Sequence, residues 1–206
     1  MKKSLVNRLV LLIAAAVFLA SCGNSTREQA KRSAGKADKT EEPVDPEDLK
    51  EESEYLMDHK VLHAFSDPAK KDEFRIVVTG KSLSKGKVIF TITNSEGKRL
   101  LTEEFEADYL LGYEFEGNIN SQKETDAFIT KRIKSFFSED HFKVPAIAAD
   151  VAFEADQSYY IDKETWQEIK SDNQSIGFYY LLGKEDGRHI AFSKKKGKVV
   201  MYYNCC

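Results

Sequence analysis

The sequence predicts an α+β domain, in which an antiparallel β-sheet is packed by one amphipathic helix and followed by a C-terminal meander of three strands. Three observations support this class. Short apolar runs separated by glycine-bearing turns fill residues 74–105, apolar side chains recur at helical spacing over residues 121–137, and three further runs close the chain. The domain is expected to span residues 49–206, an ordinary length for one domain.

The domain is expected to open with a helix. Acidic residues after Pro46 suit the positive end of a helix dipole, and apolar side chains recur as far as Phe65, before Pro68 closes the segment. In such a helix His59 and His63 lie four residues apart on one side, so they could share a metal ion, or else be solvated or capping histidines. No third ligand accompanies them at a fixed spacing in the sequence, and no metal is expected.

Four short strands are expected after this helix. The runs at 74–78 and 88–93, the turn at 94–97 and the run at 98–105 have the pattern of a hairpin with a glycine-bearing turn. A fourth strand is expected at 109–115, where four large side chains share one face at period two: Tyr109, Leu111, Tyr113 and Phe115. Short neighbouring strands of this kind predict an antiparallel sheet.

The strongest helical signal begins at Ser121. Its hydroxyl and the carboxylate of Glu124 have the spacing of a capping box, in which each satisfies a free backbone N–H. Beyond them the apolar residues recur on one side of the helix: Phe128, Ile129, Ile133, Phe136 and Phe137. Burying such side chains contributes roughly 1.5 to 3 kcal/mol each, so this face is expected to pack on the sheet.

The rest of the domain is expected to form a strand at 151–161, a short helix at 163–170, and a meander with strands at 178–182, 189–192 and 199–203. Aromatic residues are frequent here: Tyr159, Tyr160, Trp166, Phe178, Tyr179, Tyr180, Tyr202 and Tyr203. Exposed rings could form a platform for sugars or peptide groups, although alternation along strands would send half of them into the core.

Two short motifs imitate known sites without their context. Thr79-Gly80-Lys81-Ser82 imitates the end of a phosphate-binding loop, but Arg75 stands where the first glycine belongs and a strand follows instead of a helix, so a turn is expected. Ser82-Leu83-Ser84-Lys85 and Ser171-Asp172-Asn173 match two of the three elements of penicillin-recognising serine enzymes, and the sequence lacks the third. No catalytic residue is expected from either motif.

The first 21 residues have the layout of a signal peptide. Basic residues between Lys2 and Arg8 precede an apolar run from Leu9 to Leu19, and small residues lead to Cys22. The run is about eleven residues long, whereas roughly 20 are needed to span a bilayer, so a permanent transmembrane helix is not expected. An ordinary secretory signal followed by a coincidental cysteine is the alternative.

The block Leu19-Ala20-Ser21-Cys22-Gly23 resembles the lipobox of bacterial lipoproteins. The resemblance implies that Cys22 is acylated with three chains, palmitate among them, becomes the new N-terminus and holds the protein to a membrane. An Asp after the Cys marks inner-membrane retention in enterobacteria, and Gly23 favours the outer membrane instead. Surface-exposed lipoproteins of the Bacteroidetes carry an acidic cluster past the Cys. This chain has basic residues there, which favours the periplasmic face: Arg27, Lys31 and Arg32.

Residues 22–48 are expected to form a flexible charged tether, because from Asn24 onward they hold no aromatic or large aliphatic side chain apart from Val44. The chain has 31 basic and 34 acidic residues, and three of the basic ones lie in the signal peptide, which leaves 28 against 34 in the mature protein. Because of this acidic balance, nucleic acid is not an expected partner. The basic cluster at 194–198 is expected to keep a hairpin tip soluble.

Cys205 and Cys206 form a possible thiol site, because lipidation of Cys22 would leave only this adjacent pair. Adjacent Cα atoms lie about 3.8 Å apart across a trans peptide, so a bridge between the two sulfurs would be strained. Four alternatives remain open: free or packed thiols, a strained redox-active pair, a metal-binding pair, and a bridge between two chains. No cofactor is expected.

The lipobox, the charged tether, the small α+β domain and the Cys-Cys end together resemble uncharacterised lipoproteins of gut Bacteroidetes. This resemblance implies no activity. The expected function is that of a membrane-anchored cell-envelope lipoprotein, a non-catalytic binding or assembly module for an unknown envelope protein or glycan. The alternative is an envelope hydrolase or thiol-redox enzyme that uses Cys205 and Cys206.

Overall fold

The computed structural model describes residues 55–205. The signal peptide, Cys22, the tether and Cys206 lie outside these residues, as does the start of the expected domain, so the expectations for them stay predictions. No helix between residues 55 and 205 is long and apolar enough to span a membrane.

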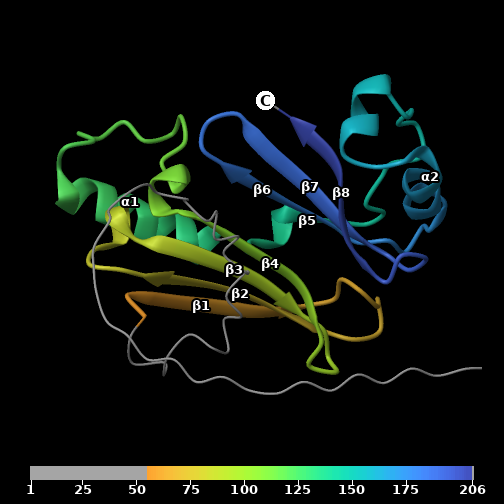
Figure 1. The fold of residues 1–206 in the computed structure, drawn as a ribbon, viewed down its shortest axis with the longest axis horizontal. Helices are drawn as coiled ribbons and strands as arrows, with labels where there is room; N and C mark the ends of the chain where they lie inside the picture. Colours follow the sequence, from red (N-terminus) through yellow and green to blue (C-terminus); the bar gives the residue numbers. More distant parts are fainter. Residues whose placement is uncertain (1–54, 206) are drawn as a thin grey trace, which may run out of the picture. The chain divides into compact units, whose positions relative to one another are not determined.

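Two antiparallel sheets of four strands each form the domain, which confirms the predicted α+β class (Figure 1). The first sheet has the order β1-β2-β3-β4, with β1 at Met57–His63, β2 at Asp72–Thr79, β3 at Lys87–Thr93 and β4 at Arg99–Glu106. The second has the order β5-β6-β7-β8, with β5 at Phe142–Lys143, β6 at Gly177–Leu182, β7 at Asp186–Ser193 and β8 at Lys198–Cys205.

β6, β7 and β8 form the predicted C-terminal meander. Their turns contain Gly183 and Gly197, with φ of 62° and 63°, a left-handed conformation that glycine adopts without steric cost. β7 begins at Asp186, whereas its strand was expected to begin at residue 189, so the turn between β6 and β7 is shorter than expected.

The main core lies between the two sheets, where aromatic side chains from both sheets meet. The ring centroids of Phe74 in β2 and Phe178 in β6 are 5.2 Å apart, and those of Phe90 in β3 and Tyr180 in β6 are 5.4 Å apart. All four side chains are buried, and they belong to one continuous apolar cluster. The two sheets are therefore held together by burial of large rings.

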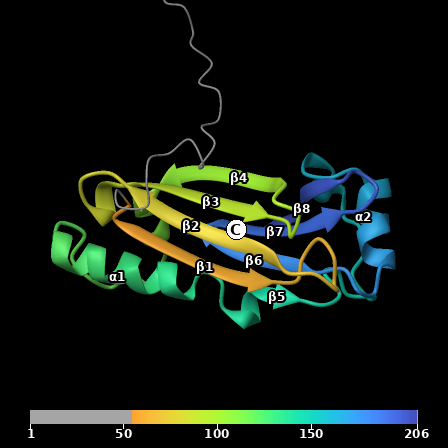
Figure 2. The same ribbon diagram turned by 90° about the horizontal axis from the view of Figure 1, so that it is seen from below.

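α1 (Gln122–Ser135) lies beside β1 and packs its apolar face into this core (Figure 2). The Ser121 hydroxyl accepts the backbone N–H of Glu124, which confirms the predicted start of the helix. Ile129 and Ile133 are fully buried, as the helical spacing predicts. The Glu124 carboxylate instead accepts the backbone N–H of Asn118 at 2.9 Å, which fixes the loop before the helix.

β1 occupies the described part of the segment where a helix was expected. Half-buried side chains, Met57, His59, Val61 and His63, alternate with the exposed Asp58, Lys60 and Leu62, which is the periodicity of a strand. Arg75 of β2 holds the Asp58 carboxylate with hydrogen bonds of 2.8 and 3.0 Å. The helix prediction was wrong because pairing with β2, a partner further along the chain, decides the conformation here.

A 3-10 helix, η3 (Ala107–Leu110), and a loop occupy the segment where a strand was expected at 109–115. Leu110 and Leu111 are both buried although they are consecutive, while Tyr109 and Tyr113 are exposed. The period-two pattern therefore predicted the wrong element, and the four side chains do not share one face.

A loop and the 3-10 helix η5 (Ala155–Tyr159) replace the strand expected at 151–161. The Glu154 carboxylate accepts the backbone N–H of Gln157, and the Gln157 Oε1 atom accepts the backbone N–H of Glu154 at 2.8 Å. This capping box satisfies backbone groups locally, in place of a β ladder. α2 (Lys163–Ser171) follows as predicted, and the Asp162 side chain caps it by accepting the N–H of Thr165.

A polar network joins β4 to the second sheet. The Glu103 carboxylate of β4 pairs with the Arg188 guanidinium of β7 and accepts a hydrogen bond from the Tyr180 hydroxyl of β6. Arg188 also binds Asp186 at 2.6 Å, and Asn204 of β8 donates to the same carboxylate at 2.6 Å. Burial raises the pKa of Tyr180 well above its usual value, so the phenol remains a hydrogen-bond donor.

Candidate ligand-binding site

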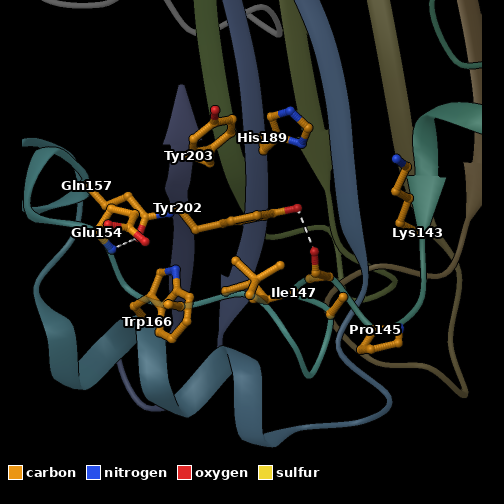
Figure 3. Close-up of a pocket in the computed structure, with 13 residues that line it drawn as sticks. Lys143, Pro145, Ile147, Glu154, Gln157, Trp166, His189, Tyr202 and Tyr203 are labelled. Carbon is orange, nitrogen blue, oxygen red and sulfur yellow. Dashed lines mark hydrogen bonds between the residues drawn. The ribbon is translucent and has the colours of Figure 1, made fainter. Parts of the chain in front are cut away.

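A pocket of about 430 Å³ opens between β8, α2 and the segment that follows β5 (Figure 3). Apolar residues of that segment line it, among them Pro145, Ile147 and Val151. Four rings complete the wall: Trp166, His189, Tyr202 and Tyr203. The volume and the mostly apolar lining are those of small-molecule sites, which are concave and carry a few placed polar groups.

A β-bulge in β8 shapes the pocket. The register between β7 and β8 shifts between His189 and Ile190, and Tyr202 is the extra residue. A bulge bends its strand and re-aims side chains, and the consecutive Tyr202 and Tyr203 both line the pocket here. The Tyr202 hydroxyl donates a hydrogen bond of 2.8 Å to the carbonyl oxygen of Ala146, which fixes its ring across the pocket floor (Figure 3).

Gly177 in β6 provides the space for this tyrosine. A Cβ at that position would lie 2.7 Å from the Tyr202 hydroxyl oxygen and 3.1 Å from the Cα of Ala146. The backbone N–H of Ala146 in turn donates to two oxygen atoms of Ser175, the carbonyl oxygen at 2.9 Å and the hydroxyl oxygen at 3.1 Å. The floor of the pocket is therefore rigidly built from β6, β8 and the segment after β5.

Trp166 of α2 carries an unpaired donor at the pocket. The residue is 1% exposed, and its indole Nε1 has no hydrogen-bond partner in the structure. In Figure 3 this nitrogen lies on the edge of the ring that faces Gln157 and Tyr202. Leaving a buried donor unpaired costs about 1 to 3 kcal/mol, so an acceptor that reached this nitrogen, with a small shift of the side chains that cover it, would gain from pairing with it.

His189 of β7 is a neutral ring at the pocket wall. Its centroid lies 4.8 Å from that of Tyr179 and 5.3 Å from that of Tyr203. Burial lowers its pKa to about 4, and the positive charge of Lys143 acts in the same direction. At neutral pH the imidazole therefore offers one donor and one acceptor nitrogen and no charge.

Ion pairs at the surface join α2 to the β7–β8 hairpin. Each of the three consecutive lysines at the hairpin tip has an acidic partner in or next to α2: Lys194 with Asp172, Lys195 with Glu164, and Lys196 with Asp162. The Ser193 hydroxyl also donates to Glu168 at 2.6 Å. The hydrogen bond from Lys196 is the main reason why the pKa of Asp162 is lowered. The basic cluster, expected only to aid solubility, thus has a structural partner.

Cys205, the described member of the possible thiol site, is a free and half-buried cysteine near the end of β8. It pairs with Gly187 of β7, and its sulfur lies where a side chain at Gly187 would stand. The structure gives the thiol no hydrogen bond to any residue from 55 to 205. The pairing of Cys205 with Cys206 stays a prediction, because Cys206 lies outside the described residues.

His59 and His63 lie on a strand, so the helical face on which they could share a metal does not exist. Each ring stacks on a phenylalanine instead, with centroid distances of 5.7 Å from His59 to Phe137 and 3.6 Å from His63 to Phe142. Across residues 55–205, no cluster of three or more His, Cys, Asp or Glu side chains is arranged to hold a metal ion.

The other sequence candidates do not come together in one site. Gly80, with φ of 124°, lies in the turn expected after β2, and Ser82 precedes the short 3-10 helix η2 (Leu83–Lys85). Asp172 ends α2 and binds Lys194. Of the eight aromatic residues considered as a platform, four are buried: Trp166, Phe178, Tyr180 and Tyr202. Among the exposed ones, only Tyr203 lines the pocket.

The arrangement is suited to non-covalent binding: a concave apolar wall, an unpaired indole N–H, a neutral imidazole, and the charged side chains of Lys143 and Glu154 at the two ends (Figure 3). Family models, curated protein sequences and solved structures gave no match to this chain.

Proposed function

We propose that the protein is a lipid-anchored lipoprotein of the bacterial cell envelope whose folded domain binds a small molecule in the pocket between β8 and α2. The observation that carries the binding part is the unpaired Nε1 of Trp166 beside an open apolar pocket. Buried donors in native proteins are almost always paired, so a bound ligand is a direct way to complete this one. The lipid-anchored part is supported by the lipobox at Cys22.

Binding is favoured over catalysis by the state of the polar groups at the pocket. The Tyr202 hydroxyl is engaged with the Ala146 carbonyl, and the Glu154 carboxylate accepts a backbone N–H of η5. The alternative, thiol chemistry at Cys205 and Cys206, would need a group that activates a sulfur. Cys205 packs against the bare Gly187 and has no hydrogen bond within the described part of the chain that could serve this purpose.

The location proposed is the periplasmic face of the outer membrane, with the domain attached through acylated Cys22. Cys22→Ala is expected to leave an unprocessed or soluble precursor, because acyl chains on this sulfur are the only strong membrane attachment proposed. Cell fractionation followed by mass determination checks this. The anchor proposal fails if the variant keeps both its processing and its detergent-dependent membrane fraction. Cys205→Ser serves as the matched control and should fractionate like the parent.

The pocket itself is tested through its own tryptophan, because Trp166 is the only one in the chain. A library of small ring compounds is added to the detergent-solubilised mature protein while the indole N–H proton resonance is followed by NMR. Compounds that bind in the pocket are expected to move this single resonance, and compounds with an oxygen acceptor should move it most. If binding compounds leave it unmoved, the proposed site is wrong.

A further inference from the structure

Lys143 is a cation without a partner at the pocket. It belongs to the two-residue strand β5, is exposed, lines the pocket, and makes no ion pair with any residue from 55 to 205. The lysines of the neighbouring hairpin differ, because Lys194, Lys195 and Lys196 each have a carboxylate partner. The positive charge of Lys143 also acts on His189 in the pocket wall, because it contributes to the lowered pKa of this histidine.

The pocket also carries a negative charge, at its other end. Glu154 lies at the other end from Lys143 (Figure 3), and its carboxylate accepts the backbone N–H of Gln157 in the capping box of η5. His189 is uncharged at neutral pH. Because Glu154 would repel an anion, an anionic group of a ligand would lie at the Lys143 end of the described pocket.

The aromatic side chains that line the pocket favour ligands with flat rings. Trp166, Tyr202, Tyr203 and His189 present aromatic surface to the pocket, and such surfaces prefer the faces and edges of other rings. A plain alkyl chain would leave the Trp166 N–H unpaired. A sugar would bring many hydroxyl groups to a wall that is mostly apolar, where they would lose their hydrogen bonds to water.

We infer that the pocket takes a small aromatic carboxylate or a similar ring-bearing anion, with its anionic group at Lys143 and an oxygen acceptor at the Trp166 N–H. This inference rests on the proposed binding function and adds the chemical class of the ligand. Hydrogen bonds with an ionised partner are among the stronger ones, so the anionic group should contribute measurably to affinity.

The test compares three probes that share one ring system: 6-hydroxy-2-naphthoate, its uncharged amide 6-hydroxy-2-naphthamide, and 2-naphthoate, which lacks the hydroxyl. Binding to the solubilised mature protein is measured by calorimetry. The hydroxy acid is expected to bind about tenfold more tightly than the amide. Lys143→Gln should remove this difference, whereas Lys123→Gln, at an exposed position of α1 away from the pocket, should keep it.

The hydroxyl is tested in the same way with Trp166→Phe, which keeps a ring and removes the N–H. The preference for 6-hydroxy-2-naphthoate over 2-naphthoate is expected to vanish in this variant, and a thermal melt checks that it remains folded.

Equal binding of acid and amide, or a preference that survives Lys143→Gln, overturns the inference. If none of the three probes binds while other ring compounds move the Trp166 resonance, the ligand class is wrong and the proposed function stands. If no compound that binds the protein moves that resonance, both the inferred ligand class and the proposed function are wrong.

Discussion

Ile133→Asp is expected to abolish cooperative folding. Ile133 is 0% exposed and packs from α1 into the core between the two sheets. The change removes a large apolar side chain, which costs about 2 to 5 kcal/mol, and buries a carboxylate without a partner, which costs more. A domain of this size has a total stability of roughly 5 to 15 kcal/mol. Thermal unfolding followed by circular dichroism provides the measurement.

Lys131→Asp is the matched control, because it places the same side chain on the exposed face of the same helix. It should melt within a few degrees of the parent. An Ile133→Asp variant that melts like this control would mean that the α1 face is not part of the core.

Arg188→Met is expected to lower the free energy of unfolding by about 1 to 3 kcal/mol, less than the roughly 3 to 5 kcal/mol of a fully buried pair, because the carboxylate that loses its partner is only partly buried. Glu103 is 15% exposed at its side chain and is paired with Arg188 across the gap between β4 and β7. When the guanidinium is removed, the Tyr180 hydroxyl is the one remaining partner of the Glu103 carboxylate among the described residues. Urea denaturation at neutral pH measures the loss.

Two further variants separate this explanation from a general loss of packing. Arg132→Met removes the partner of Glu114, a carboxylate that is 72% exposed, and should cost no more than about 1 kcal/mol. The double variant Glu103→Leu with Arg188→Met removes both charges and should recover most of the stability. Equal losses for Arg188→Met and Arg132→Met would contradict a special role for the partly buried pair of Glu103 and Arg188.

The elements that the sequence predicts well are those decided by local signals. The capping residue Ser121 and the spacing of Ile129 and Ile133 lie within a few residues of one another, and α1 forms where they indicate. The meander is also local, because short turns at Gly183 and Gly197 join its strands. β1 was predicted wrongly because its identity depends on β2, and its own residues fit either a helix or a strand.

The candidate site could not be predicted from the sequence, because several distant segments build it. The pocket combines Lys143 of β5, Trp166 of α2 and Tyr202 of β8. The spacing of these residues along the chain matches no known motif that would predict a site. One signal was present: Tyr202 and Tyr203 break the alternation expected of a strand, and a bulge lies there. The unpaired state of the Trp166 N–H depends on neighbours that only the fold brings near.

A crystal structure of the mature domain with the ring compound that moves the Trp166 resonance most would test the proposed site directly. Ligand density is expected between Tyr202, His189 and Trp166, with an acceptor atom within hydrogen-bond distance of the indole Nε1. Ligand density elsewhere on the protein, with the Trp166 N–H still unpaired or paired to the chain itself, would contradict the proposed site.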